Sequence, residues 1–183
     1  NVVARGAGKY GCSIVGIPGH RIENVTLSNV KMGFTGGGTK ERITLEVPEL
    51  ENKYPEGTMF GVLPAYGFYC RHVDGLTFRD IDLRHSKAEP RPALVCDDVQ
   101  NLRLDGFSAQ VAADAPSQII LRNTSGALIT GCHPPEADVF LRLENQSASV
   151  NVLASDLSRV KTPFAFDAST PKSAVYADFN RVP

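Results

Sequence analysis

The sequence predicts an all-β protein, a parallel β-helix, on the basis of three observations. A short phrase of alternating apolar residues recurs along the chain, with its first apolar residue at Leu76, Leu102, Ala127 and Val150, at intervals of 23 to 26 residues. An internal period of this length is typical of a solenoid. Within each copy the apolar residues alternate with a period of two, which puts neighbouring side chains on opposite faces of a strand. No stretch shows the 3.6-residue period of a helix, so each coil consists of strands.

Each coil of about 25 residues is predicted to contain three strands. A first strand, such as the one that begins at Phe68, leads into a two-residue polar turn. The second strand, such as the one that begins at Leu76, ends at an Asn, Asp or Gly kink before the third. Strands of successive coils then pair in parallel at about 4.8 Å. An upstream copy of the phrase begins at Val25, so the coils extend over most of the chain.

Aligning the coils places the turn residues in two columns along the side of the helix. The first column alternates in charge and the second is polar; they contain Arg71, Asp97, Arg122 and Glu144, and His72, Asp98, Asn123 and Asn145. Opposite charges on neighbouring coils attract, so the first column should help to fix the register. Exposed pairs contribute only about 0–1 kcal/mol each, so the effect on stability is small.

The chain is predicted to form one domain, residues 1–183, that is interrupted by a long excursion at 33–66. Three consecutive glycines, Gly36 to Gly38, open the excursion, and several prolines follow, which marks irregular backbone. We interpret the triple glycine as a hinge or turn, because no Lys-Ser, Lys-Thr or helix start follows it as in a phosphate-binding loop. Residues 158–183 are interpreted as an irregular last coil and a cap.

The first residues do not provide a comparable cap. Residues 1–11 contain three glycines and few apolar side chains, so they cannot cover a coil cross-section of Ile, Val, Leu and Phe. An uncovered coil exposes both a strand edge and an apolar core. We therefore expect a missing N-terminal segment or another chain to cover the first coil, and the β-helix to be truncated at that end.

Composition and charge argue against several kinds of partner. The net charge is −1, with both signs mixed along the chain, so no basic surface for nucleic acid or an anionic membrane is predicted. No run approaches the 18 or so apolar residues of a membrane span. No cofactor and no metal are predicted. A zinc site at Cys70, His72 and Cys96 is disfavoured, because His72 has the opposite parity to the thiols and no ligand pair has metal-site spacing.

The cysteines at 12, 70, 96 and 132 lack the density of a disulfide scaffold. Cys70 and Cys96 occupy the same column of adjacent coils and have inward parity. Free thiols that stack as small core side chains are favoured over a disulfide, since side chains stacked on neighbouring parallel strands seldom meet disulfide geometry.

Three stretches of the chain, Gly11 to Val30, Val47 to Glu51 and Tyr54 to His72, resemble a known family. They are similar to the C-terminal portion of bacterial polygalacturonase-like enzymes of glycoside hydrolase family 28, and the likeness runs from about Gly11 to Gly106. The resemblance implies a right-handed parallel β-helix and the hydrolysis of pectin-type polysaccharides that contain galacturonic acid. It also implies a periplasmic or secreted location in a bacterium.

The catalytic residues of that family are not carried over to this chain. The family's motifs are Asn-Thr-Asp, Asp-Asp, Gly-His-Gly and Arg-Ile-Lys, in that order. Here only Asp97-Asp98 matches, and it follows the Gly19-His20 pair instead of preceding it. Inverting hydrolysis also needs two carboxyl groups roughly 6.5–9.5 Å apart on either side of the scissile bond, whereas these two are neighbours at a turn. We interpret both as structural turn residues, and predict no catalytic residue and no activity for this chain alone.

Two functions stay open on this reasoning. The chain is either the C-terminal part of a polygalacturonase-like hydrolase whose catalytic coils are missing from it, or a stand-alone β-helical carbohydrate-binding, surface or structural protein. In the excursion, aromatic rings suit the C–H faces of a sugar, and carboxylates accept hydrogen bonds from its hydroxyl groups. The predicted saccharide contacts are Tyr66, as the first choice, with Tyr54, Phe60, Glu49, Glu51 and Arg71. The equal alternative is that the three rings only anchor the excursion to the body.

Overall fold

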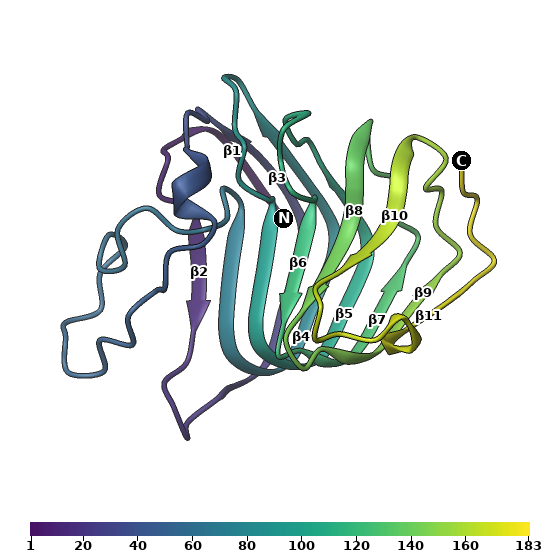
Figure 1. The fold of residues 1–183 in the computed structure, drawn as a ribbon. Coiled ribbons are helices and arrows are strands. Elements are labelled where there is room, and N and C mark those ends of the chain that lie inside the picture. Colours follow the sequence, from purple (N-terminus) through teal and green to yellow (C-terminus); the bar gives the residue numbers. More distant parts are fainter.

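The structure, a computed structural model, describes all 183 residues and is a parallel β-helix of about seven turns (Figure 1). This confirms the predicted all-β class. The only helices are two three-residue 3₁₀ turns, η1 (Lys40–Arg42) and η2 (Lys172–Ala174). The structure therefore contains no helix with the length and apolar character that a membrane span requires.

Eleven strands form the coils, and all their pairings are parallel. They are β1 (Val2–Ala7), β2 (Cys12–Val15), β3 (Ile22–Phe34), β4 (Phe68–His85), β5 (Leu94–Ala109), β6 (Ile119–Arg122), β7 (Ser125–Thr130), β8 (Ala137–Glu144), β9 (Ala148–Leu153), β10 (Val160–Phe166) and β11 (Val175–Asp178). The two longest, β4 and β5, bend around the corners of the helix, so each supplies all three sides of a coil.

The observed register is the one that the repeat predicts. Leu76 pairs with Val25 on one side and with Leu102 on the other, and Ala127 pairs with Val150. The inward side chains of these positions form one core cluster that runs along the axis of the helix. Cys70 pairs with Cys96 within this core, and both thiols are free and buried, as predicted.

Each coil turns at corners where one residue adopts a left-handed backbone conformation. In the second predicted column, His72, Asp98, Asn123 and Asn145 have φ between 47° and 60°. His, Asn and Asp tolerate this conformation better than other residues with a Cβ atom, which explains why the column is polar. A further corner, which includes Gly75, was not predicted from the sequence.

The excursion covers an apolar strip on the outer face of the helix. Tyr69, Val95 and Ile120 point outward from successive coils, yet each is at most 2% exposed. They form a second, smaller core with residues of the excursion, namely Ile43, Val47, Leu63 and Ala65, against which Phe60 also packs. Burial of this apolar surface stabilises the excursion in one place on the body.

A buried ion pair holds the two ends of the excursion together. The Glu89 and Arg91 side chains are fully buried, and Arg91 Nη2 lies 2.7 Å from Glu89 Oε2. The Gly38 N–H donates to the same carboxylate at 3.0 Å, and Arg91 Nη1 donates to the Leu63 carbonyl at 2.9 Å. A Cβ atom on Gly38 would overlap the guanidinium of Arg91, so only glycine allows this approach. The triple glycine is predicted to be a hinge or turn. Gly36 and Gly37 have φ of 71° and 88°, in keeping with a turn, whereas Gly38 is a packing position.

Candidate functional site

A polar pocket of about 420 Å³ lies on the side of the helix, between the excursion and the corner occupied by His72 and Asp98. Its lining comes from both sides: Thr44, Leu45, Glu46, Val47 and Glu49 from the excursion, and Tyr69, Arg71, His72, Asp97, Asp98, Arg122 and Asn123 from the coils. The first three residues of each predicted column line this pocket, and the fourth of each, Glu144 and Asn145, does not. The register that the repeat imposes therefore also places the polar groups of the site.

His72 joins two carboxylates at one side of the pocket. Its Nδ1 lies 2.6 Å from Asp98 Oδ2, and its Nε2 lies 3.3 Å from Glu49 Oε1. Arg21, from the first coil, donates to Asp98 Oδ1 at 2.5 Å and to the Asp98 carbonyl at 2.7 Å. Glu49 Oε2 lies 3.0 Å from Arg71 Nη2. These five side chains form a continuous polar network that ties three coils to the excursion.

Asp98 is held as a carboxylate by this network. Burial alone raises the pKa of the Asp98 carboxyl, but hydrogen bonds from Arg21 and His72 outweigh burial and hold this pKa below its usual range. A general acid near neutral pH needs the opposite, a carboxyl group whose pKa is raised. The geometry therefore favours the interpretation of Asp98 as a structural turn residue.

Replacing Asp98 with asparagine is expected to destabilise the protein mainly at neutral pH. A carboxyl whose pKa is lower in the folded state stabilises above its unfolded pKa, and loses this contribution as the pH falls through the folded value. For Asp98 the contribution is complete at neutral pH and is lost only below about pH 4, the usual aspartate value. We expect Asp98→Asn to cost about 1–2 kcal/mol at pH 7 and clearly less at pH 3, measured by urea unfolding.

The control for this experiment is Asp105→Asn, because Asp105 makes only loose contacts with Arg79 and Arg103, at 3.8 and 4.0 Å. It should change the free energy of unfolding little at either pH. An Asp98→Asn loss of the same size at pH 7 and pH 3 would contradict the assignment of an ionised, hydrogen-bonded Asp98.

Arg71 lines the pocket but makes structural contacts, and its role as a saccharide contact stays a prediction. It is 5% exposed, and its guanidinium donates to the carbonyls of Val47 and Pro48 at 2.5 and 3.0 Å. Arg71 pairs in register with Asp97, as predicted, but its ion pair forms with Glu49. The excursion brings this carboxylate to the guanidinium and buries it, and Arg71 Nε, which has no hydrogen-bond partner, is buried as well.

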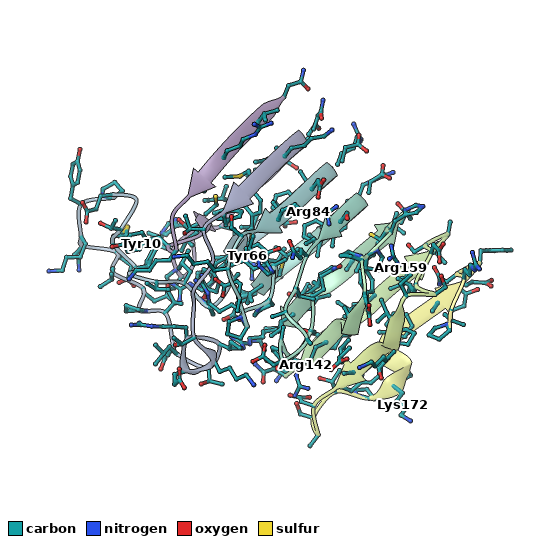
Figure 2. The ribbon with its side chains drawn as sticks, turned by 90° about the horizontal axis from the view of Figure 1, so that it is seen from above. Tyr10, Tyr66, Arg84, Arg142, Arg159 and Lys172 are labelled. Carbon is teal, nitrogen blue, oxygen red and sulfur yellow. The ribbon has the colours of Figure 1, made fainter.

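Tyr66 is fully buried, so it does not present its ring to a ligand as predicted. Its hydroxyl donates to the Gln110 carbonyl at 2.5 Å, and its ring meets those of Phe34 and His85 edge to face, each at a centroid distance of 5.4 Å. Figure 2 shows Tyr66 among the side chains within the body of the molecule. Burial raises the pKa of this hydroxyl strongly. For Tyr66 the alternative that was left open, a ring that anchors the excursion, describes the structure.

The structure separates the other predicted contacts. Only Glu49 lies in the polar pocket. Glu51 and Phe60 line a second, more apolar cavity near β2, which Glu49 also lines, and Phe60 is half-buried against the smaller core. Tyr54 is 86% exposed and lines neither cavity. The excursion therefore does not present the predicted set of residues as one saccharide surface.

Sequence reasoning missed Glu46 and Asn123 as lining residues of the pocket, and treated Asp97 only as a turn residue. Asp97 accepts a hydrogen bond from Asn123 Nδ2 at 3.3 Å and has no ion-pair partner within 4.0 Å. Arg122, by contrast, donates to Glu144 at 2.7 Å and to the Ile43 carbonyl at 3.2 Å. A signal was present in the sequence, because Tyr69, Val95 and Ile120 make an outward apolar column beside the polar ones. Such a column needs a cover, and a cover next to polar columns makes a pocket.

The fold and the site together define a parallel β-helix with a polar side pocket between the excursion and the coils. No group of three or more His, Cys, Asp or Glu side chains is arranged to hold a metal ion. Comparisons of the chain with protein-family models, curated proteins and solved structures found no match. The resemblance to polygalacturonase-like enzymes therefore stays a prediction.

Proposed function

We propose that this chain is the C-terminal, substrate-binding part of a polygalacturonase-like glycoside hydrolase, and that coils outside this chain supply the catalytic carboxylates. The observation that carries the proposal is the polar pocket on the side of a parallel β-helix, with acceptor oxygens that no protein cation occupies. The phrases between Gly11 and His72 that resemble the family supply the substrate class, a pectin-type polysaccharide. Asp98, locked between Arg21 and His72, contributes no acid to the reaction.

The free groups of the pocket suit sugar hydroxyls better than sugar carboxylates. Glu46 and Asp97 line the pocket without an ion pair, and a carboxylate accepts hydrogen bonds from hydroxyl groups. The two arginines of the pocket are bound within the protein, Arg71 to Glu49 and Arg122 to Glu144. We therefore expect the pocket to prefer methyl-esterified galacturonate units, which are neutral, over the free acid, which the unpaired carboxylates repel.

Asp97→Ala tests this proposal by calorimetric titration with methyl-esterified oligogalacturonides. The substitution removes two acceptor oxygens from the pocket, and a hydrogen bond to a charged group contributes about 1.5–3 kcal/mol, so affinity should fall by about tenfold or more. The matched control is Asp105→Ala, which removes an equivalent side chain outside the pocket and should bind like the wild type. The same titration with the unesterified oligosaccharide should give a weaker affinity.

Two results would overturn the proposal. One is that the wild-type protein binds neither form of the oligosaccharide, and the other is that Asp97→Ala and Asp105→Ala bind equally well.

A further inference from the structure

The first coil of the helix has an open strand edge. β2 pairs with β4 alone, and β1 covers β3 only from Val30 to Phe34. Neither β2 nor the first half of β3, residues 22–28, has a partner on the side away from β4. The corresponding parts of β4 are paired on both sides, with β2 and β3 on one and β5 on the other.

The hydrogen-bonding groups of the open edge follow from the pairing on the other side. The N–H groups of Cys12 and Gly16 donate toward β4, to the carbonyls of Gly67 and Arg71, at 2.7 and 2.9 Å. Successive residues of a strand direct their backbone groups to alternate sides, so Ser13 and Val15 present theirs to the open edge. An unpaired edge of this kind is a template for the addition of another strand.

The apolar core is also less covered at this end of the helix. Five inward side chains of the first coil are only half-buried, namely Cys12, Ile14, Ile22, Val25 and Leu27. Their partners one coil further along are at most 3% exposed: Phe68, Cys70, Val73, Leu76 and Phe78. The same columns that form the core elsewhere therefore lack their next layer here.

The excursion forms a second wall in front of this edge. Figure 1 shows it, in blue, extending past β2 on the side away from the other coils. Between them lies a cavity of about 750 Å³, and half of its lining residues are hydrophobic. Ile14 and Val25 line it from the coil, and Leu50, Met59 and Phe60 line it from the excursion. We call this cavity and the edges of β2 and β3 the socket.

We propose that the socket binds a polypeptide, the strand–turn–strand segment of an adjoining β-helix coil, in parallel with β2 and the first half of β3. This inference rests on the proposed function, in which the catalytic coils supply the segment. The position of β1 supports this proposal. β1 pairs with the end of β3, which is the third side of the first coil, so β1 already forms the third side of the adjoining coil. The bound segment completes that coil and covers the half-buried layer.

The charge of the socket adds a preference for the bound segment. Two carboxylates without an ion pair, Glu51 and Glu56, line the cavity together with a single cation, Lys53, while Glu49, which also lines it, is paired with Arg71. Complementary charges favour a segment that carries basic residues where its turn meets the excursion. A peptide with the sequence of residues 68–78 meets these requirements, because it has a strand, a turn that contains Arg and His, and a second strand.

This peptide is the probe for a binding experiment under reducing conditions. We expect saturable binding to the wild-type protein, with slower hydrogen exchange of the Ser13 and Val15 amides when the peptide is bound. Ser13→Pro removes one N–H from the open edge but none of the N–H groups that bond to β4, so binding should weaken at least tenfold. Ser13→Ala keeps this N–H group and should bind like the wild type. Thermal unfolding of both variants verifies that they fold.

Three outcomes would overturn the inference. The peptide could fail to bind the wild-type protein, or could bind Ser13→Pro and Ser13→Ala equally. In the third, sedimentation without peptide shows a self-association that Ser13→Pro abolishes, which would assign the socket to a second copy of the chain. None of these readouts depends on saccharide binding, because Ser13 does not line the polar pocket. Failure of this inference and failure of the proposed function are therefore separate results.

Discussion

Replacing Arg91 with methionine is expected to destabilise the protein by about 3–5 kcal/mol, because the substitution leaves a buried carboxylate without its cation. Glu89 is fully buried and accepts from Arg91 through both of its oxygens, at 2.8 and 2.7 Å. Arg91 also donates to the carbonyls of Leu63 and Ala65, so the variant loses donors at the C-terminal end of the excursion as well. Urea unfolding at pH 7 measures the loss.

The pH dependence of that loss has a definite sign. Burial alone raises the pKa of the Glu89 carboxyl, but hydrogen bonds from Arg91 outweigh burial and hold this pKa below its usual range. In the wild type, Glu89 therefore stabilises at neutral pH and loses this contribution in acid. In Arg91→Met, only the backbone N–H groups of Gly38 and residue 91 still oppose burial, so the pKa of Glu89 rises and protonation relieves the penalty. The difference between wild type and variant should shrink as the pH falls from 7 to 4.

Two controls separate the ion pair from general effects. The double variant Glu89→Leu/Arg91→Met removes both charges and should be no less stable than Arg91→Met at pH 7. Lys161→Met breaks the exposed pair with Asp138 and should have little effect. A loss in Arg91→Met no larger than that in Lys161→Met would contradict a closed, buried pair.

The coils were predictable from the sequence because a solenoid repeats its structure with its sequence. Once the phrases at Leu76 and Leu102 are aligned, the pairing of Arg71 with Asp97 follows, as the structure confirms. The partner of the Arg71 charge did not follow. It lies in the excursion, where no period relates one residue to another, and the choice of Glu49 over Asp97 depends on how that segment folds back.

The site was harder to predict for the same reason. Tyr66 and Arg91 both belong to irregular segments, where parity does not say which side chains point inward. Their burial depends on contacts with residues remote in sequence, such as Phe34 and Leu63. The corner at Gly75 was missed because its positions in the successive coils hold only Gly, Asn and Ser. These residues carry no charge, so they form no alternating charge pattern like that of the first column.

Tyr66→Ala is expected to lower the stability by about 3–5 kcal/mol, the usual cost of deleting a buried aromatic side chain. The ring fills space between Phe34 and His85, so its loss leaves a cavity lined by aromatic side chains. Tyr66→Phe keeps the ring and removes the hydroxyl that donates to the Gln110 carbonyl and, at 3.4 Å, to the Leu83 carbonyl, so it should cost about 1–2 kcal/mol. Thermal unfolding measures both, and the alanine variant should melt roughly 10 °C below the wild type in a domain of this size.

The same variants decide between an anchor and a ligand contact. Tyr66 lies outside the polar pocket, and its side chain has no exposed surface, so neither substitution should change the affinity for a methyl-esterified oligogalacturonide at temperatures where the variants are folded. An affinity that fell in Tyr66→Phe as well as in Tyr66→Ala would require the hydroxyl to leave Gln110 and reach the ligand. That result would mean that the excursion opens on binding, because the ring is enclosed while the excursion lies on the smaller core and on the Glu89–Arg91 pair.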